Sequence, residues 1–471
     1  MTKLPKISVF NLGCKVNQYD GDAMLAVFKT AGFEITEGLE FADVYIINSC
    51  AVTAEAEKKS RQAVTRIKKV NPNATIYVCG CASQNNFAQF AKDGVKYIAG
   101  TDNKLGLARR IVEEYTGDEE VFDKIFNPDD FTIGNTFEDN DGVVNLLTRH
   151  FIKVQDGCNN FCSYCLIPYV RGRSRSRSQE SILRELDSVE GVAKEVVVTG
   201  INLSAYGKDT GTSLTELLKA FKKYKKFGVR LGSLEVGVID RDFLDATTKI
   251  KLFCPHFHLS LQSGNDDVLR AMNRRYTTRE YYAAVRLIRE YYPNAAITTD
   301  IIVGYPAETE EEFVSSMKFA KKVGFADIHV FPYSSRKGTV AGRMKPLAPE
   351  ILEDRAKRMG EVKQELIGNY LMKQIGIPVR VLFETQEDGI WVGHTQTYVK
   401  VYSKHGARNK VFTITPQRRY KDGICDASVD NGLRENDGFD SRYDAEFGKP
   451  CTEVLTVEDY KEQMKKIIDF E

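Results

Sequence analysis

Short apolar runs alternate with amphipathic stretches over the first 115 residues. Apolar runs of this length predict strands, and apolar positions repeated every three or four residues predict the helices between them. The predicted strands are 7–12, 43–48, 75–78 and 95–99, and the predicted helices are 18–31, 54–70 and one ending near 115. This alternation predicts an α/β domain with a doubly wound parallel sheet.

A second α/β pattern begins at residue 151. Its predicted strands are 196–199, 230–234, 256–261, 296–303 and 327–331, and its clearest helices are 279–291 and 310–323. Strands that recur every 25–40 residues predict a parallel (β/α) barrel, complete or partial, and we expect the partial form. Polar side chains that end such strands then gather at one rim of the barrel.

The pattern changes again after a charged helix predicted at 350–374. Short strands at 378–383, 389–394, 398–402 and 411–415 predict a small β-barrel or sandwich, and one helix is predicted at 457–468. The predicted domains are 1–116, an acidic linker 117–149, the barrel 150–371, the β domain 372–428 and an acidic tail 429–471.

Composition is that of an ordinary globular protein. Of the 471 residues, 42% are hydrophobic and 28% charged, which excludes wholesale disorder and a collagen-like repeat. No segment approaches the ~20 consecutive apolar residues of a membrane span, and residues 1–6 lack the apolar stretch of a signal peptide. We therefore expect a cytoplasmic protein without a membrane partner.

The net charge of +1 hides an uneven distribution. Residues 117–149 carry −7 and residues 429–471 carry −6, which leaves +14 on the three predicted folded domains. A near-neutral total argues against a nucleic-acid partner, whereas a basic body with acidic connectors is compatible with one.

The clearest chemical motif is the run Cys158, Cys162 and Cys165. Thiolates hold iron–sulfur clusters, and three cysteines around a four-iron cluster leave one iron free to bind a further ligand. The alternatives are a three-cysteine zinc site with a remote fourth ligand, or unrelated thiols on a loop. Because the run opens the barrel pattern, we favour a catalytic cluster.

Three further cysteines, Cys14, Cys50 and Cys81, each follow a predicted strand of the first domain. The carboxyl ends of parallel strands meet at one edge of the sheet, so these cysteines can converge on a second cluster. Cys79 lies within its strand, and Cys81 is therefore the better ligand. Buried structural thiols are the alternative.

Both cysteine sets, in this order, resemble those of the radical S-adenosylmethionine methylthiotransferases. The resemblance runs from about residue 6 to 427 and rests on matches at 12–19, 47–53, 168–173, 258–264, 272–276 and 299–306. Gly13-Cys-Lys-Val-Asn-Gln18 is most similar to the branch that acts on N6-threonylcarbamoyladenosine beside the tRNA anticodon. The terminal β domain is similar to the family's TRAM domain, an RNA-binding module.

The resemblance implies two [4Fe–4S] clusters and S-adenosyl-L-methionine as cofactors. Cys158, Cys162 and Cys165 would hold the cluster that cleaves S-adenosylmethionine to a radical, and Cys14, Cys50 and Cys81 an auxiliary cluster that presents sulfur. The candidate cofactor contacts are Tyr164, Thr199, Gly200, Ser233, Glu235, Ser260, Gln262 and Asp300, for most of which packing at the barrel rim is as good an interpretation.

Basic residues offer candidate RNA contacts. Arg171, Arg173, Arg175 and Arg177 alternate, so an extended run would put them on one face, where they could bind phosphate or a ligand carboxylate. A solvated charged strand is the alternative. The terminal domain adds nine Lys and Arg residues with interleaved aromatic side chains, although its Trp391 is more typical of a core. We interpret His256, His258 and His329 as hydrogen-bonded structure.

The leading hypothesis is a tRNA methylthiotransferase that acts on N6-threonylcarbamoyladenosine in the anticodon stem-loop. A same-class alternative acts on N6-isopentenyladenosine or on a ribosomal protein side chain. A different-class alternative is a non-catalytic iron–sulfur RNA-binding protein. An enzyme of this type also needs an electron donor such as flavodoxin or ferredoxin.

Overall fold

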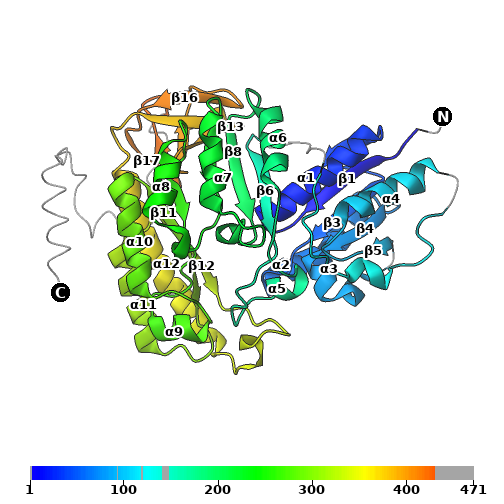
Figure 1. Ribbon diagram of the computed structural model, residues 1–471, viewed down its shortest axis with the longest axis horizontal. Coiled ribbons are helices and arrows are strands. Elements are labelled where there is room, and N and C mark those ends of the chain that lie inside the picture. The colour runs from blue at the N-terminus through cyan, green and yellow to red at the C-terminus, as the bar shows by residue number, and fades with distance from the viewer. Residues whose placement is uncertain (1–2, 93, 118–119, 141–147, 430–471) are drawn as a thin grey trace, which may run out of the picture. The chain divides into compact units, whose positions relative to one another are not determined.

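The first sheet has five parallel strands. The computed structural model describes residues 3–92, 94–117, 120–140 and 148–429, and the helices and strands all lie in the unit Met1–Asp426 (Figure 1). The strand order is β2-β1-β3-β4-β5. The strands are β1 (Lys6–Asn11), β2 (Glu34–Glu37), β3 (Val44–Ser49), β4 (Thr75–Gly80) and β5 (Val95–Ile98). The helices are α1 (Lys15–Thr30), α2 (Ala54–Val70), α3 (Cys81–Asn85) and α4 (Lys104–Thr116).

Helices cover both faces of this sheet, as predicted. On β3, Val44 and Ile46 pack in one cluster with Phe28 of α1, whereas Ile47 packs in another with Ile67 of α2. Successive side chains of a strand point to opposite faces, so alternate residues build two separate cores. The prediction missed β2, a short edge strand in which only Thr36 is buried.

Six further parallel strands follow one another in sequence order. They are β6 (His150–Asp156), β8 (Glu195–Gly200), β9 (Gly228–Leu231), β10 (His256–His258), β11 (Ala296–Val303) and β12 (Asp327–Pro332), with β7 (Arg175–Ser176) antiparallel to β6. A bridge between Leu234 and Leu259 joins the β6–β9 and β10–β12 groups. Within the described residues no pairing joins β12 to β6, so the barrel is partial.

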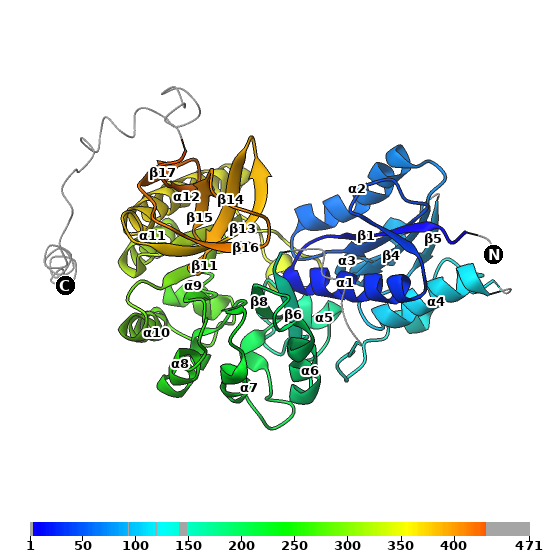
Figure 2. The same ribbon diagram turned by 90° about the horizontal axis from the view of Figure 1, so that it is seen from above.

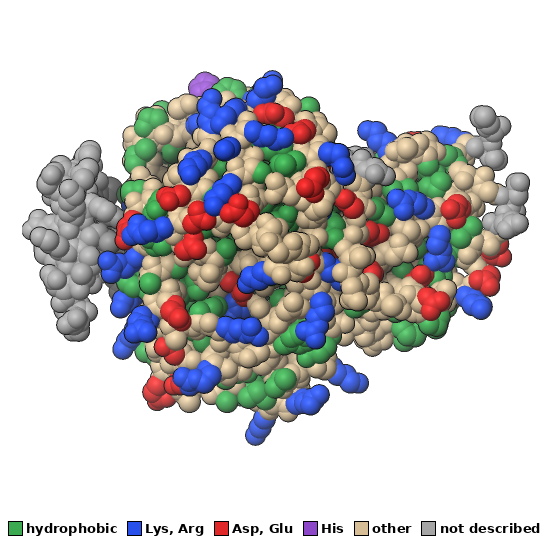
Figure 3. Space-filling view, viewed as in Figure 1, with side chains coloured by type: hydrophobic (Ala, Val, Ile, Leu, Met, Phe, Trp, Pro, Cys, Tyr) green, Lys and Arg blue, Asp and Glu red, His purple; other side chains and the backbone are tan. Residues whose placement is uncertain are grey.

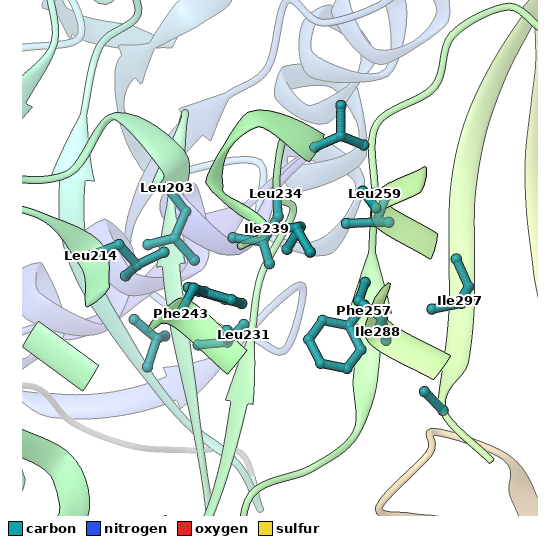
Figure 4. Close-up of a cluster of buried hydrophobic side chains, with 14 of the residues drawn as sticks. Leu203, Leu214, Leu231, Leu234, Ile239, Phe243, Phe257, Leu259, Ile288 and Ile297 are labelled. Atoms are coloured by element: carbon teal, nitrogen blue, oxygen red, sulfur yellow. The ribbon is translucent and has the colours of Figure 1, made fainter. Parts of the chain in front are cut away.

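The barrel helices lie on the outer side of these strands (Figure 2). They include α6 (Gln179–Val189), α7 (Leu214–Ala220), α8 (Arg241–Thr248), α9 (Asp266–Ala271), α10 (Thr278–Tyr291) and α11 (Glu310–Val323). Leu231, Phe257 and Ile297 pack outward against Phe243 of α8 and Ile288 of α10 (Figure 4). The residues between these apolar positions therefore face the barrel interior.

A six-stranded sheet follows the long helix α12 (Pro349–Met372). Its strands are β13 (Val379–Glu387), β14 (Ile390–Thr395), β15 (Lys400–Ser403), β16 (Lys410–Ile414), β17 (Arg418–Tyr420) and β18 (Gly423–Cys425), in the order β16-β13-β14-β15-β18-β17. All neighbouring pairs are antiparallel except β15 and β18. Trp391 packs against the core of this sheet, in agreement with its interpretation as a core residue.

The described part of 117–149 packs against the first sheet. The Ile98 amide donates to the Ile125 carbonyl at 2.8 Å, and the Glu138 carboxylate accepts from the Leu105 amide at 2.9 Å. Phe122 is buried against Tyr97. The domain boundaries remain predictions, and the helix predicted at 457–468 lies outside the described residues. No helix in the described part of the chain is long and apolar enough to cross a membrane.

Candidate active site

Cys14, Cys50 and Cys81 come together at the carboxyl edge of the first sheet. Cys14 precedes α1, Cys50 follows β3 and Cys81 begins α3. Strand order reverses between β1 and β3, and open α/β sheets bind their ligands at this switch point. The pKa of Cys50 is raised to about 12, mainly by burial. A backbone hydrogen bond opposes this shift, and the charges of Cys81 and Cys14 add to it.

Close approach at this edge requires a glycine before Cys14. Gly13 has a φ of +95°, and a Cβ there would lie 2.4 Å from the Cys50 Sγ. Cys14 is exposed, whereas Cys50 and Cys81 are buried. The three thiols therefore form a site that is open on the Cys14 side. Cys79, by contrast, points into the core cluster on the opposite face of the sheet.

Arg171 joins the two cysteine regions. Its Nε donates to the Cys81 Sγ at 3.2 Å, and its Nη1 donates to both carboxylate oxygens of Asp156 at 3.1 and 3.0 Å. Nη2 donates to the Asn17 side chain. Arg171 is 1% exposed, and Asp156 ends the strand that leads to Cys158. A single buried guanidinium group thus contacts the first triad and the base of the second cysteine loop.

The expected single face of four arginines is wrong. Only Arg175 and Ser176 form a strand, and three of the four side chains are buried in ion pairs. The pairs are Arg171 with Asp156, Arg175 with Asp102 and Arg177 with Glu185. Arg173 alone is exposed and lies over the Phe161 ring. Three of these arginines therefore stabilise the fold and are not available to phosphate groups.

Cys158, Cys162 and Cys165 lie on one loop after β6. The Asn160 and Ile167 amides point at the Cys158 and Cys165 sulfurs at 3.5 and 3.4 Å. The pKa of Cys165 is raised to about 12, mainly by burial. The hydrogen bond from the Ile167 amide opposes this shift, and the charges of Cys162 and Cys158 add to it. The three thiols are therefore electrostatically coupled.

A second arginine contacts this loop. The Arg274 Nη1 lies 3.2 Å from the Cys162 Sγ, and its Nη2 lies 3.2 Å from the Glu235 carboxylate. Its Nε donates to the Tyr276 hydroxyl at 3.0 Å. Sequence reasoning took Arg171 for a phosphate or carboxylate contact and assigned no role to Arg274, although both lie in segments that carry the family resemblance, 168–173 and 272–276.

The sulfur spacing of both triads is too wide for a mononuclear zinc site. Zn–S bonds of ~2.3 Å put two sulfurs on one zinc at most about 4.6 Å apart. Within the described residues, the group of three candidate ligands that lie within 4.8 Å of one another is His258, Asp300 and His329. Neither cysteine triad forms such a compact group, and three thiolates are the donor set that holds an iron–sulfur cluster.

The predicted cofactor contacts separate into two groups. Glu235 accepts from the Asn160 side chain at 2.6 Å, so it touches the cysteine loop directly. The Ser260 carbonyl accepts from the Tyr276 hydroxyl, which also bonds Arg274. Tyr164 is half-buried, and its pKa is raised by burial and by the neighbouring Cys162.

The remaining predicted contacts lie elsewhere on the barrel strands. Thr199 is buried and Gly200 contacts Gln155 at the end of β8, whereas Ser233 is exposed. The Gln262 amide donates to the Asp300 carbonyl at 2.8 Å. The Asp300 carboxylate lies 3.2 Å from the His258 Nε2.

A cavity of about 520 Å³ opens beside the cysteine loop. Asn160, Glu235, Arg274 and Tyr276 line it together with residues of α10. Its volume is in the range of small-molecule and cofactor sites, ~300–1,000 Å³. The residues that contact Cys162 therefore also border a space large enough for a cofactor.

Comparison with known proteins identifies the two α/β regions. Residues 152–320 match the radical SAM superfamily, and residues 6–100 match the family described as uncharacterized protein family UPF0004. A radical S-adenosylmethionine methyltransferase from Kitasatospora setae, TsrM, with cobalamin and a [4Fe-4S] cluster bound, superimposes with a TM-score of 0.53 at 15% identity. The match covers 73% of this chain and 77% of that one, and it shows the fold.

Curated relatives match most of the chain. Threonylcarbamoyladenosine tRNA methylthiotransferase MtaB is 33% identical in Bacillus subtilis, over 88% of this chain and 94% of that protein. In Aquifex aeolicus it is 38% identical, over 80% and 92%. A tRNA-2-methylthio-N(6)-dimethylallyladenosine synthase from Bacillus mycoides is 32% identical, over 83% and 79%. The chain therefore belongs to the radical S-adenosylmethionine tRNA methylthiotransferases.

Proposed function

We propose that this enzyme converts N6-threonylcarbamoyladenosine at position 37 of tRNA, 3′ of the anticodon, to its 2-methylthio derivative. The observation that carries the proposal is the pair of three-cysteine sites linked through Arg171 and Asp156. The MtaB relatives named for this nucleoside are 33–38% identical, and the relatives named for dimethylallyladenosine are 31–32% identical.

Two sites suit a reaction that ordinary acid–base catalysis cannot achieve. The C2–H bond of adenine is not acidic enough for a side-chain base, so its replacement needs radical chemistry from a cofactor. When bound, S-adenosylmethionine and two [4Fe–4S] clusters would supply the radical, the sulfur and the methyl group. In this proposal, Cys158, Cys162 and Cys165 hold the radical-generating cluster, and Cys14, Cys50 and Cys81 hold the sulfur-presenting one.

The chain's own residues would bind and orient these groups. Arg171 and Arg274 each place a positive charge 3.2 Å from one cysteine sulfur, where it would offset the negative charge of a thiolate-bound cluster. Glu235 contacts Arg274 and Asn160 and borders the cavity beside the loop, whose volume is suited to a small-molecule cofactor such as S-adenosylmethionine. An external donor such as flavodoxin or ferredoxin would supply electrons.

The terminal sheet is the proposed tRNA-binding module. Arg380, Lys404, Arg408, Lys410 and Lys421 are exposed on it. Lys and Arg side chains are spread over the face seen in Figure 3, several of them near this sheet. Exposed cations beside aromatic side chains suit phosphate contacts and base stacking.

Nucleoside mass spectrometry of tRNA from a deletion strain tests the substrate. We expect 2-methylthio-N6-threonylcarbamoyladenosine to disappear and its unmethylthiolated precursor to accumulate. An unchanged level would refute the proposal, and loss of 2-methylthio-N6-isopentenyladenosine instead would assign the alternative substrate.

Anaerobic reconstitution tests the two sites. We expect about eight irons per chain and reductant-dependent 5′-deoxyadenosine, because two four-iron clusters are assigned. Cys162→Ala should abolish 5′-deoxyadenosine formation, whereas Cys50→Ala should retain it with about four irons. Wild-type protein with about four irons would refute the auxiliary site, and failure to form 5′-deoxyadenosine would favour a non-catalytic protein.

A further inference from the structure

The inner face of the barrel is polar. Leu231, Phe257 and Ile297 point outward into the helical layer (Figure 4), so the residues next to them, Arg230 and His256 among them, point inward. Closed (β/α) barrels fill this interior with branched apolar side chains. A polar inner face in a barrel that does not close is instead suited to hold a polar ligand.

Helix α1 of the first domain lies against this inner face. It contacts β6 and β8, and its Asp20 forms an ion pair with the inward-facing Lys153 at 2.5 Å. Lys15 is the first residue of this helix and directly follows Cys14. The Lys15 side chain is solvent-accessible, but the protein packed around it, then the charges of Arg230 and Arg149, lower its pKa, against the attraction of Glu195 and Asp300.

The anionic groups near Lys15 already have partners. The Glu195 carboxylate lies 2.9 Å from the Arg149 Nε and 2.7 Å from the Arg230 Nε. The Asp300 carboxylate lies 3.2 Å from the His258 Nε2. In the part of the chain that the structure describes, no carboxylate lies within ion-pair distance of Lys15.

The two arginines near Lys15 are paired with carboxylates, since Arg149 also lies 2.8 Å from the Glu384 carboxylate. Burial, followed by the charges of Arg230, His258, Lys15 and His329, holds the pKa of His256 well below its usual value, so this imidazole is neutral. A ligand carboxylate would give Lys15 the ion-pair partner that the described residues do not provide.

We propose that Lys15 determines substrate specificity by binding the carboxylate of the threonylcarbamoyl substituent. This inference rests on the proposed function. Consecutive Cα atoms are 3.8 Å apart, so an adenine presented to a cluster on Cys14 lies within reach of the Lys15 side chain. The threonylcarbamoyl group carries a carboxylate, whereas the isopentenyl group is wholly apolar and gains nothing from an ammonium group.

Paired RNA ligands test this assignment without turnover. One anticodon stem-loop carries N6-threonylcarbamoyladenosine, and the other carries the same nucleoside with its carboxylate converted to a neutral carboxamide. Affinities of the reconstituted enzyme, measured by fluorescence anisotropy without reductant, give the preference for the acid. A charge-assisted hydrogen bond predicts a preference of about tenfold or more for wild type.

Three variants complete the experiment. Lys15→Gln should weaken binding of the acid to the level of the carboxamide, and Lys15→Arg should keep part of the preference. Lys29→Gln removes the same charge from the exposed last turn of the same helix and should leave the preference unchanged. Iron content verifies that each variant still holds its clusters.

Equal losses on both RNAs in Lys15→Gln would overturn the inference, because Lys15 would then contact a group common to both, such as a phosphate. A wild-type enzyme without preference for the acid would also overturn it. Failure of the proposed function is distinct, since wild-type enzyme with reductant would then not methylthiolate the acid RNA at all.

Discussion

At the scale of single residues, two buried arginines organise the cysteine sites. Each lies 3.2 Å from one sulfur, Arg171 at Cys81 and Arg274 at Cys162, and each is held by a carboxylate. Hydrogen bonds and charges near sulfur set the reduction potential of an iron–sulfur cluster. Each arginine is therefore placed to influence the reduction potential of a cluster bound at its own site.

Arg171→Met should lower the reduction potential of the proposed auxiliary cluster, because a positive charge beside it would favour the reduced, more negative state. Redox titration followed by electron paramagnetic resonance measures the shift. The variant also leaves Asp156 short of a buried partner, so unfolding free energy should fall by about 3–5 kcal/mol.

The matched control is Arg173→Met, which removes an exposed arginine from the same segment. The free energy of unfolding of this variant should change by no more than about 0.5 kcal/mol, and its cluster reduction potentials should not change. An auxiliary-cluster potential that is the same in wild type and Arg171→Met would contradict the tuning role.

At the scale of elements, helix α1 connects the first domain to the barrel through buried ion pairs. Its Asp20 is buried and pairs with Lys104 of α4 at 2.7 Å and with Lys153 of β6 at 2.5 Å. Arg171 lies 3.6 Å away. One carboxylate thus links two helices and a barrel strand, and it holds the amino end of α1, with Cys14 and Lys15, beside the barrel interior.

Asp20→Asn should destabilise the protein by about 3–5 kcal/mol, because buried Lys104 loses its counter-charge and Lys153 keeps only Asp156. Although burial opposes it, attraction by Lys104, Lys153 and Arg171 lowers the pKa of Asp20 to about 2. The unfolded carboxyl titrates higher, near 3.8. Its stabilisation is therefore present above pH ~4 and is lost as pH falls through about 2.

Denaturant unfolding at neutral and acidic pH measures both effects. Asp187→Asn is the control, since Asp187 forms an exposed pair with Lys223 and should cost less than about 1 kcal/mol. If Asp20→Asn and Asp187→Asn lose equal free energy of unfolding, the buried ion pairs of Asp20 contribute no more to stability than the exposed pair of Asp187.

At the scale of the whole molecule, charge is divided between a basic body and acidic segments. The chain as a whole carries +1, although 117–149 and 429–471 are strongly acidic. Exposed cations of the terminal sheet include Arg408 and Lys410. Counterion release makes any phosphate binding by such groups dependent on salt.

tRNA affinity should therefore fall steeply between 50 and 200 mM salt, by an amount set by the number of phosphates contacted. Replacing Arg408 and Lys410 together with Gln should reduce the slope of log K against log salt by about 0.7–0.9 per lost contact. Filter binding measures it, with Lys29→Gln as control. An unchanged slope would show that Arg408 and Lys410 do not contact tRNA phosphates.

Local patterns along the chain determined much of this structure. Helices 54–70 and 310–323 and strand 296–303 begin and end where the pattern predicts, because periodicity and caps depend on near neighbours. The Cys158, Cys162 and Cys165 run could be recognised for the same reason, since all three residues lie on one loop.

Only the tertiary structure decided which distant groups meet. Arg171 and Cys81 are 90 residues apart, Arg274 and Cys162 are 112 apart, and no periodicity links them. The alternation of arginines predicted one charged face. In the folded protein, three of these arginines are buried and each forms an ion pair with a different carboxylate. A buried charge must find a partner, and the partner is chosen by how sheets and helices pack.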